Sequence, residues 1–184
     1  MLDASSPLKG YARDFDGVSL SEVTGQALVA IATPLGDDKA VNAALKAAYG
    51  VEAPASGQSV PGKKDTRLIS TAPDQCMALF PHAGADGEAV VDKALKGAAY
   101  VTEQTDAWVI LKIEGPRVRA ALARFCPLDL HPDVFAVDQA ARTVMEHMSA
   151  VILRTGADEY LLLSASSSAG SFLHGVETSI QNIL

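Results

Sequence analysis

The chain has 184 residues, of which 48% are hydrophobic, and a chain of this size can bury roughly 70% of the surface that it exposes when unfolded. Its 15 lysines and arginines against 22 acidic residues give a net charge of −7, which argues against a nucleic-acid backbone or an anionic membrane as the main partner. We therefore expect a globular protein with no nucleic-acid partner and no membrane partner.

The cysteine usage and the lack of long apolar stretches predict a cytoplasmic protein. Cys76 and Cys126 are the two cysteines, and because neither belongs to a C-x-x-C pair we expect packed, reduced thiols and no zinc site. Residues 1–10 have no basic start followed by a long apolar run. No later apolar stretch approaches the ~18 to 20 residues needed to cross a bilayer.

The first half of the chain alternates strand-like and helix-like patterns after an arm that contains Ser, Pro and Gly. One helix should start at Asp37 and Asp38, whose carboxylates can accept hydrogen bonds from its first amides, and end at Gly50. The Gly- and Pro-rich segment 51–65 predicts a loop. The strands are expected at residues 18–23, 27–33, 66–71, 76–81 and 100–104, and a second helix at 86–97.

The second half repeats this order of elements. A strand is expected at 108–113, and Pro116 suits the first turn of the helix that follows. A proline-bearing connection runs from Cys126 to Asp138. Serines 166–168 can cap a terminal helix whose apolar face includes Phe172 and Val176. The remaining strands are expected at 143–148, 150–154 and 159–164.

These two successive series of strands and helices predict an α+β protein made of two ferredoxin-like βαββα halves. The expected divisions are an N-terminal arm at residues 1–17, a first α+β half at 18–105 and a second α+β half at 106–184. We expect the halves to form one compact unit, either sharing a sheet or packing closely.

The sequence predicts no catalytic, cofactor-binding or metal site on this chain. Gly57–Lys64 resembles a phosphate-binding loop, but Lys64 stands where a hydroxyl is needed and a strand-like segment follows, so a flexible loop is predicted. Serines 164–171 lack the G-x-S-x-G pattern of a nucleophile, and helix capping explains them. The histidines lack a ligand spacing, so no metal site is predicted at His82, His131, His147 or His174. His131, next to a proline in a connection, is expected to be a surface or capping group.

Several short motifs occur in the order and spacing of one family. The strongest is Cys126-Pro127-Leu128-Asp129-Leu130-His131-Pro132-Asp133-Val134-Phe135, which resembles a Pro-Leu-Asp-Leu-x-Pro-x-x-Phe segment. With it, the chain resembles the gamma subunit of heterotetrameric sarcosine oxidase. Cys76 stands where that family often has Trp. The other matching motifs are Ser6-Pro7-Leu8, residues 18–22, Ala72-Pro73-Asp74-Gln75, Ala141-Arg142-Thr143 and residues 151–155.

The resemblance implies a role inside a complex. Such an assembly demethylates sarcosine to glycine oxidatively, passing the one-carbon unit to tetrahydrofolate or releasing formaldehyde, and forms hydrogen peroxide. FAD, FMN and NAD would sit on the larger partner subunits, and the partners would be the alpha, beta and delta subunits. The family is also similar to the folate-binding aminomethyltransferase domain of glycine cleavage, which implies the same doubled fold, but its acidic folate motif is not found here.

Two hypotheses remain open from the sequence. The leading one is a non-catalytic gamma subunit, and the alternative is a free-standing folate-dependent aminomethyltransferase-like protein. Under the first, the arm and the connection are the expected docking elements, with Asp129 accepting hydrogen bonds from local amides. The leucines and Phe135 of the connection are expected to bury apolar area. The candidate interface residues are Leu128, Leu130, His131 and Phe135.

Overall fold

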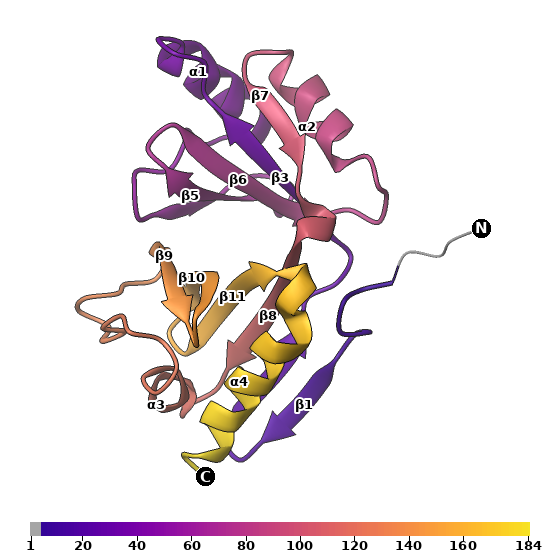
Figure 1. The fold of residues 1–184 in the computed structure, drawn as a ribbon. Helices are drawn as coiled ribbons and strands as arrows, with labels where there is room; N and C mark the ends of the chain where they lie inside the picture. Colours follow the sequence, from indigo (N-terminus) through magenta and orange to yellow (C-terminus); the bar gives the residue numbers. More distant parts are fainter. Residues whose placement is uncertain (1–4) are drawn as a thin grey trace. The chain divides into compact units, whose positions relative to one another are not determined.

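The computed structural model describes residues 5–184 and divides the chain into two compact units (Figure 1). Unit 2 is the continuous segment Gly25–Asp106, whereas unit 1 combines the residues up to Thr24 with Ala107–Leu184. Each unit has a sheet of its own, and every strand pair is antiparallel. The α+β class is therefore confirmed, and because the two sheets are separate, the first of the two expected arrangements, a shared sheet, does not form. Residues 1–4 of the expected arm lie outside the described residues.

Unit 2 is a ferredoxin-like sheet with one extra edge strand. Its strand order is β4-β5-β6-β3-β7. Without the short β4, the order β5-β6-β3-β7 is that of a βαββαβ ferredoxin-like fold. The elements in chain order are β3 (Gln26–Ala32), α1 (Asp38–Tyr49), β4 (Ser59–Pro61), β5 (Arg67–Ala72), β6 (Gln75–Pro81), α2 (Gly87–Leu95) and β7 (Tyr100–Glu103).

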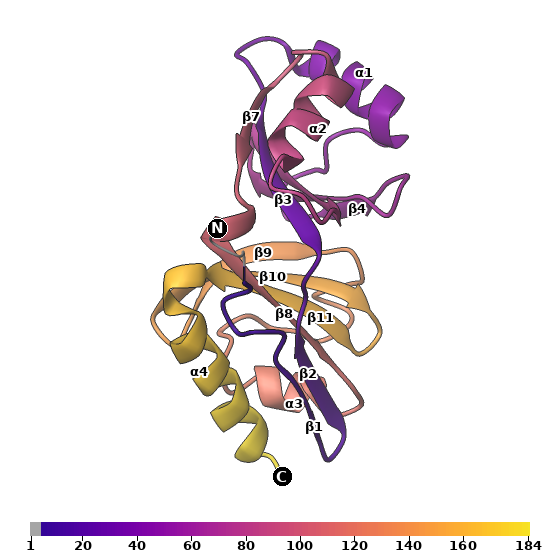
Figure 2. The ribbon, with the colours of Figure 1, turned by 90° about the vertical axis from the view of Figure 1, so that its right-hand side faces the viewer.

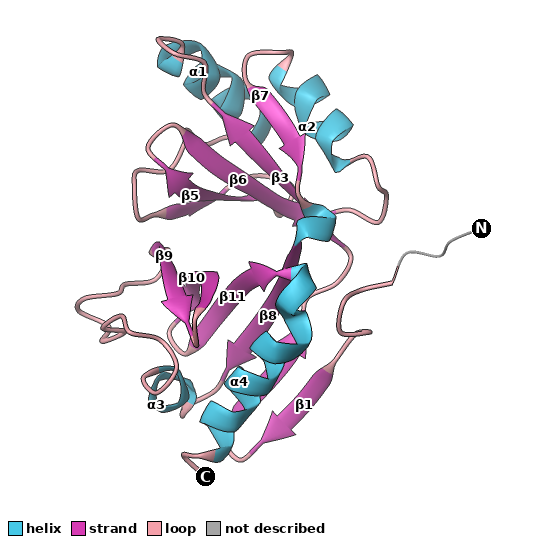
Figure 3. Cartoon of the chain, viewed as in Figure 1, coloured by secondary structure: helices cyan, strands magenta, loops and turns pink. Residues whose placement is uncertain are grey.

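Both helices of unit 2 pack against its sheet (Figure 3). At the start of α2 a Cβ on Gly87 would come within 2.8 Å of the Ala27 side chain, so the helix approaches β3 as closely as it does only because this residue is glycine. At the other end, α1 stops at Gly50, whose φ of 79° is in the left-handed region that glycine adopts readily. The helical residues buried in this core are Val41, Leu45, Tyr49, Val91 and Leu95.

Unit 1 has a six-stranded sheet in the order β1-β2-β8-β11-β10-β9. Its helices α3 and α4 lie beside each other, and the Ser179 hydroxyl of α4 donates a buried hydrogen bond of 2.6 Å to the carbonyl of Ala121 in α3. Figure 2 shows α4 along the sheet. The elements are β1 (Ala12–Phe15), β2 (Val18–Glu22), β8 (Trp108–Glu114), α3 (Val118–Leu122), β9 (Ala140–Met145), β10 (Met148–Gly156), β11 (Glu159–Ala165), the 3₁₀ turn η2 (Ser166–Ser168) and α4 (Ala169–Gln181).

The sheet of unit 1 is completed by a strand from the N-terminal segment. In unit 2 the first strand, β3, pairs on one side with β7, the last strand of that unit. The corresponding strand of unit 1, β8, pairs at this position with β2, which precedes unit 2 in the chain. The pairing of β2 with β8 runs from Ser19 opposite Glu114 to Glu22 opposite Leu111. Residues 18–24, which we expected in the first half, therefore belong to the same unit as the second half, and β1 lies within the expected arm.

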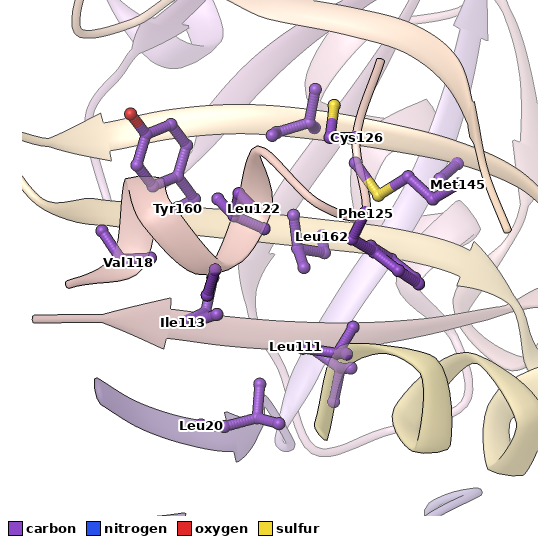
Figure 4. Close-up of a cluster of buried hydrophobic side chains, with 14 of the residues drawn as sticks. Leu20, Leu111, Ile113, Val118, Leu122, Phe125, Cys126, Met145, Tyr160 and Leu162 are labelled. Carbon is purple, nitrogen blue, oxygen red and sulfur yellow. The ribbon is translucent and has the colours of Figure 1, made fainter. Parts of the chain in front are cut away.

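The core of unit 1 gathers apolar side chains from both parts of the chain that form it (Figure 4). Leu20 of β2 lies on the same side of the sheet as the buried residues of β8 and β11, and the turn of α3 covers them. Burial of these side chains is the main favourable contribution to the stability of the unit. The labelled members are Leu20, Leu111, Ile113, Val118, Leu122, Phe125, Cys126, Met145, Tyr160 and Leu162.

Several local predictions differ from the structure. The strand expected at 143–148 ends at Met145, because Glu146 and His147 form a two-residue hairpin turn with φ of 44° and 68°. The loop expected at 51–65 contains β4. Neither Asp37 nor Ser168 caps its helix through its side chain. The hydroxyl of Ser168 instead donates to the carbonyl of Ala165, within the 3₁₀ turn that precedes α4.

Candidate functional site

The connection from Cys126 to Asp138 links α3 to β9 and contains no strand and no α-helix. Its central part is a single turn, in which the amides of Val134 and Phe135 both donate to the carbonyl of His131, at 2.9 and 2.8 Å. Pro132 suits this turn because its ring fixes φ near the helical value and it has no amide to satisfy. The turn gives neighbouring side chains different directions, so Phe135 is buried and Val134 is exposed.

Polar side chains of the connection satisfy its own backbone. The Asp129 carboxylate accepts a hydrogen bond of 2.9 Å from the amide of His131, which confirms the role expected for this aspartate. The amide of Asp133 donates to Nδ1 of His131 at 3.3 Å, an arrangement in which the neutral ring carries its proton on Nε2. At the far end, the amide of Ala136 donates to the side-chain oxygen of Gln139 at 2.7 Å. The connection is therefore a hydrogen-bonded structure with defined turns.

The buried guanidinium of Arg154, in β10, attaches the connection to the sheet. Only 5% of Arg154 is exposed. It donates to the carbonyl of Phe135 at 2.7 Å, to that of Gly156 at 3.0 Å and to that of Ala157 at 2.6 Å. The main chain of Arg154 pairs with Asp138 and Gln139 as well. A buried cation needs such acceptors. Here they are backbone carbonyls of the connection, of the last residue of β10 and of the turn that follows it.

The four candidate interface residues fall into two groups. Leu130 and Phe135 are 5% and 7% exposed and belong to the core of unit 1, and Leu128 is half-buried against the same core. His131 is exposed. The apolar side chains of the connection that do reach solvent are Val134, 56% exposed, and Val137, 45% exposed. The sequence does not mark these two valines as exposed, because an irregular segment has no periodicity that would show which side chains face solvent.

The N-terminal segment is also hydrogen-bonded to unit 1. The carboxylate of Glu22, a buried residue of β2, accepts hydrogen bonds from the hydroxyl of Ser6 and from the amides of Leu8 and Gly10, at 2.8, 3.1 and 2.7 Å. The phenol of Tyr11 donates to the Glu177 carboxylate in α4 at 2.6 Å. This part of the expected arm is therefore attached within the chain itself.

The other chemically notable side chains do not converge on a site in the part of the chain that the structure describes. His82 contacts Asp86, four residues later in the loop before α2, at 2.7 Å, and this hydrogen bond lowers the pKa of the exposed Asp86 carboxyl. No group of three or more His, Cys, Asp or Glu residues among residues 5–184 could hold a metal ion. Within the same range, no helix is long and apolar enough to span a bilayer.

Two hollows in the described part of the chain have polar groups in their lining. An open one of about 550 Å³ in unit 1 is lined by Ser168, Gly170 and Ser171 at the start of α4, with His174 and Glu146 beside them. Its serines and His174 share no hydrogen bond in the described structure, so they form no nucleophile and base pair there. A smaller hollow of about 190 Å³ in unit 2 is lined by the start of α1 and by the turn around Pro73 and Asp74.

Comparison with protein families gives a clear assignment. A family model described as the sarcosine oxidase gamma subunit family matches residues 35–179. The chain belongs to the sarcosine oxidase gamma subunit family. The gamma subunit of Arthrobacter sp. is 32% identical over 142 residues, which are 73% of this chain and 69% of the relative. The gamma subunit of Corynebacterium sp. strain U-96 is 31% identical over 139 residues, 72% of this chain and 65% of the relative.

Solved structures agree with this assignment. A chain of the heterotetrameric sarcosine oxidase from Corynebacterium sp. U-96, in complex with pyrrole 2-carboxylate, has a TM-score of 0.77 at 25% identity, over 90% of this chain and 84% of that one. The glycine cleavage system aminomethyltransferase T from Bartonella henselae has a TM-score of 0.67 at 20% identity, over 87% of this chain and 45% of that one. The second likeness shows the fold, and it confirms the expected similarity to the aminomethyltransferase fold.

The gamma-family match contains the whole connection together with Arg154, but it begins after β2. Two of the motifs that suggested the family, Ser6-Pro7-Leu8 and residues 18–22, therefore lie outside the matched range. The strongest motif, Cys126–Phe135, and the motif at residues 151–155 both lie inside it, and in the structure they are joined by the hydrogen bond from Arg154 to Phe135.

Proposed function

We propose that this chain is the gamma subunit of a heterotetrameric sarcosine oxidase and has no catalytic site of its own. The observation that carries the proposal is membership of the gamma family, supported by the TM-score of 0.77 with a chain of a heterotetrameric sarcosine oxidase. In the proposed reaction the complex oxidises sarcosine with oxygen and water to glycine, formaldehyde and hydrogen peroxide. When tetrahydrofolate is present, the one-carbon unit passes to it instead.

The proposed partners are the alpha, beta and delta subunits, of which the larger alpha and beta subunits would carry FAD, FMN and NAD. The proposed location is the cytoplasm. The sequence supports the placement of the cofactors on the partner subunits, because this chain contains no G-x-G-x-x-G segment between a strand and a helix to hold a dinucleotide. Two charged side chains of the candidate site hold the backbone of the connection in place, which is a structural role. Arg154 and Asp129 both bind the backbone of the connection.

The proposal is tested by co-expressing this chain with the three candidate partners from its genomic neighbourhood. The four chains should co-purify in fixed proportion through size-exclusion chromatography, and the complex should produce hydrogen peroxide when sarcosine is added. A preparation without this chain is the control, and we expect it to be less stable or less completely assembled. The isolated chain should be colourless and should not oxidise sarcosine.

Two results would contradict the proposal. The first is failure of the chain to associate with any of the candidate partners under conditions in which those partners are folded. The second is stoichiometric flavin, or tetrahydrofolate-dependent one-carbon transfer, on the isolated chain, which would favour the free-standing aminomethyltransferase-like alternative. The fold shared with aminomethyltransferase T does not favour that alternative by itself, since one fold supports many functions.

A further inference from the structure

The connection presents two apolar side chains to solvent within four residues. Val134 and Val137 are 56% and 45% exposed, while Phe135 between them is buried in the core of unit 1. Exposed valines occur singly on many surfaces and need no explanation. These two flank a side chain whose burial fixes the segment, so they are held outward by the same packing that holds Phe135 inward.

The segment that carries these valines is fixed by hydrogen bonds at several points. The turn is closed by the two amides that donate to the carbonyl of His131, and the carbonyl of Phe135 is held by Arg154. Beyond it, the side-chain oxygen of Gln139 accepts from the amide of Ala136. A surface that is ordered before association loses little conformational entropy on binding, so its apolar contacts contribute more fully to affinity.

The charge of the segment indicates what kind of surface fits it. Residues 126–138 contain Asp129, Asp133 and Asp138 and no lysine or arginine. Asp129 and Asp133 are exposed. The cation that contacts this segment, Arg154, is buried beneath it and is bonded to carbonyl groups. A complementary surface therefore carries positive charge around the place that receives the valines.

We propose that the outward side of the connection, made of Asp129, His131, Asp133, Val134 and Val137 and called here the Val134 surface, docks on another subunit of the complex. The receiving surface is an apolar hollow surrounded by lysine or arginine side chains. The inference rests on the proposed function, since it identifies the part of the gamma chain that makes the contact. It replaces Leu130 and Phe135 as contact residues, because they are used inside unit 1.

The first test uses the purified complex of the other three subunits as the binding partner and measures its dissociation constant for the gamma chain. The double variant Val134→Lys with Val137→Lys should bind at least about tenfold more weakly, because cations would enter an apolar hollow that is surrounded by other cations. The matched control is Val90→Lys, since Val90 is 41% exposed on α2 in unit 2. We expect it to bind within about twofold of the wild type, because its helix lies outside the docking surface.

The second test concerns charge. The variant Asp129→Asn with Asp133→Asn keeps the oxygen that accepts from the amide of His131, so the turn should persist. It should associate more slowly than the wild type at low salt, and its association rate should fall less between about 0.05 and 0.5 M NaCl. Thermal melting and circular dichroism of every variant establish that each is folded.

The outcomes separate the two proposals. If the wild type binds the other subunits and the valine variants bind equally well while folded, the Val134 surface is not the docking site and the proposed function stands. If binding depends on the valines but not on the two aspartates, the receiving surface is not lined by lysine or arginine side chains, and that part of the proposal is wrong. If the wild type does not bind the other subunits at all, both the function and the docking surface are refuted.

Discussion

The side chain of Arg154 and the main chain of Phe135 meet in a buried hydrogen bond of 2.7 Å, although 19 residues separate them in the sequence. The bond joins β10 to a segment without regular secondary structure. Because the same guanidinium also donates to Gly156 and Ala157, one side chain fixes both the connection and the turn between β10 and β11. The stability of unit 1 should therefore depend strongly on this arginine.

Replacing Arg154 by Met should lower the free energy of unfolding of unit 1 by about 3 kcal/mol or more, because three carbonyl groups lose a charged donor. Trp108 is the single tryptophan and lies at the start of β8, so its fluorescence in a urea titration follows unit 1. The control is Arg142→Met on the exposed side of β9, expected to change stability by less than about 0.5 kcal/mol. If the midpoint of urea unfolding were the same for the Arg154 variant and the wild type, the stabilising role of this arginine would be contradicted.

Replacing Phe135 by Ala should cost about 3 to 5 kcal/mol, because the ring is buried and its removal leaves a cavity. The neighbouring Val134→Ala substitution, at a position that is 56% exposed, should cost less than about 0.5 kcal/mol. Both values come from the same fluorescence titration. Equal stability of the two variants would mean that Phe135 does not occupy the core.

Replacing Tyr160 by Phe should leave unit 1 as stable as before or stabilise it by about 1 kcal/mol. The Tyr160 hydroxyl is buried without a hydrogen-bond partner among the described residues, and burial raises the pKa of this phenol. Its ring lies 5.8 Å from the Arg154 guanidinium, a contact that Phe retains. Calorimetric melting of the variant decides the matter, and a clear loss of stability would show that the hydroxyl is bonded.

The stability of unit 1 should decrease in strongly alkaline solution through Tyr11. Burial raises the pKa of the Tyr11 phenol to about 12, and the hydrogen bond to the Glu177 carboxylate adds to the rise. An unfolded tyrosine has a pKa of about 10. The stabilisation by the protonated phenol is therefore complete below pH ~10 and is lost as the pH rises from about 10 to about 12.

The test compares the wild type with Tyr11→Phe by urea unfolding at several pH values. Their difference in unfolding free energy should be constant below pH ~10 and should shrink above it, because the variant has no proton to lose. Tyr100→Phe is the control, since Tyr100 is exposed in unit 2, and it should leave the pH dependence of unit 1 unchanged. A difference that stays constant up to pH ~12 would exclude the role given to Tyr11.

Much of the element order could be predicted from local patterns, whereas strand partners could not. The apolar run 27–33 and the helical spacing from Val41 to Ala48 indicate β3 and α1 directly, because periodicity reflects burial on one side. The pairing of β2 with β8 depends on contacts between residues about 90 positions apart, and no local pattern encodes it. The hairpin turn at Glu146 and His147 was missed because it lacks the Asn-Gly type of sequence that usually marks such turns.

The candidate site was predictable as a segment and not as a surface. The run from Cys126 to Phe135 was singled out by its resemblance to a family motif, and Asp129 was correctly expected to bind a nearby amide. The burial of Phe135 was also correctly expected. Without periodicity, however, the sequence does not show that Val134 points outward. Arg154 was not foreseen as a buried residue, since a single arginine at the end of a strand is usually exposed and its carbonyl acceptors come from two separate places in the chain, Phe135 and the adjacent pair Gly156 and Ala157.

The use of β2 to complete the sheet of unit 1 has a consequence for the order in which the protein is made. Synthesis produces β2 first, but its partner β8 emerges only after all of Gly25–Asp106 has been translated. Unit 2 is continuous and can fold while the ribosome is still producing the rest, as domains generally do. The apolar side of β2 stays without its partner strand until β8 arrives, so this strand remains open to aggregation and to chaperones for as long as unit 2 is being made.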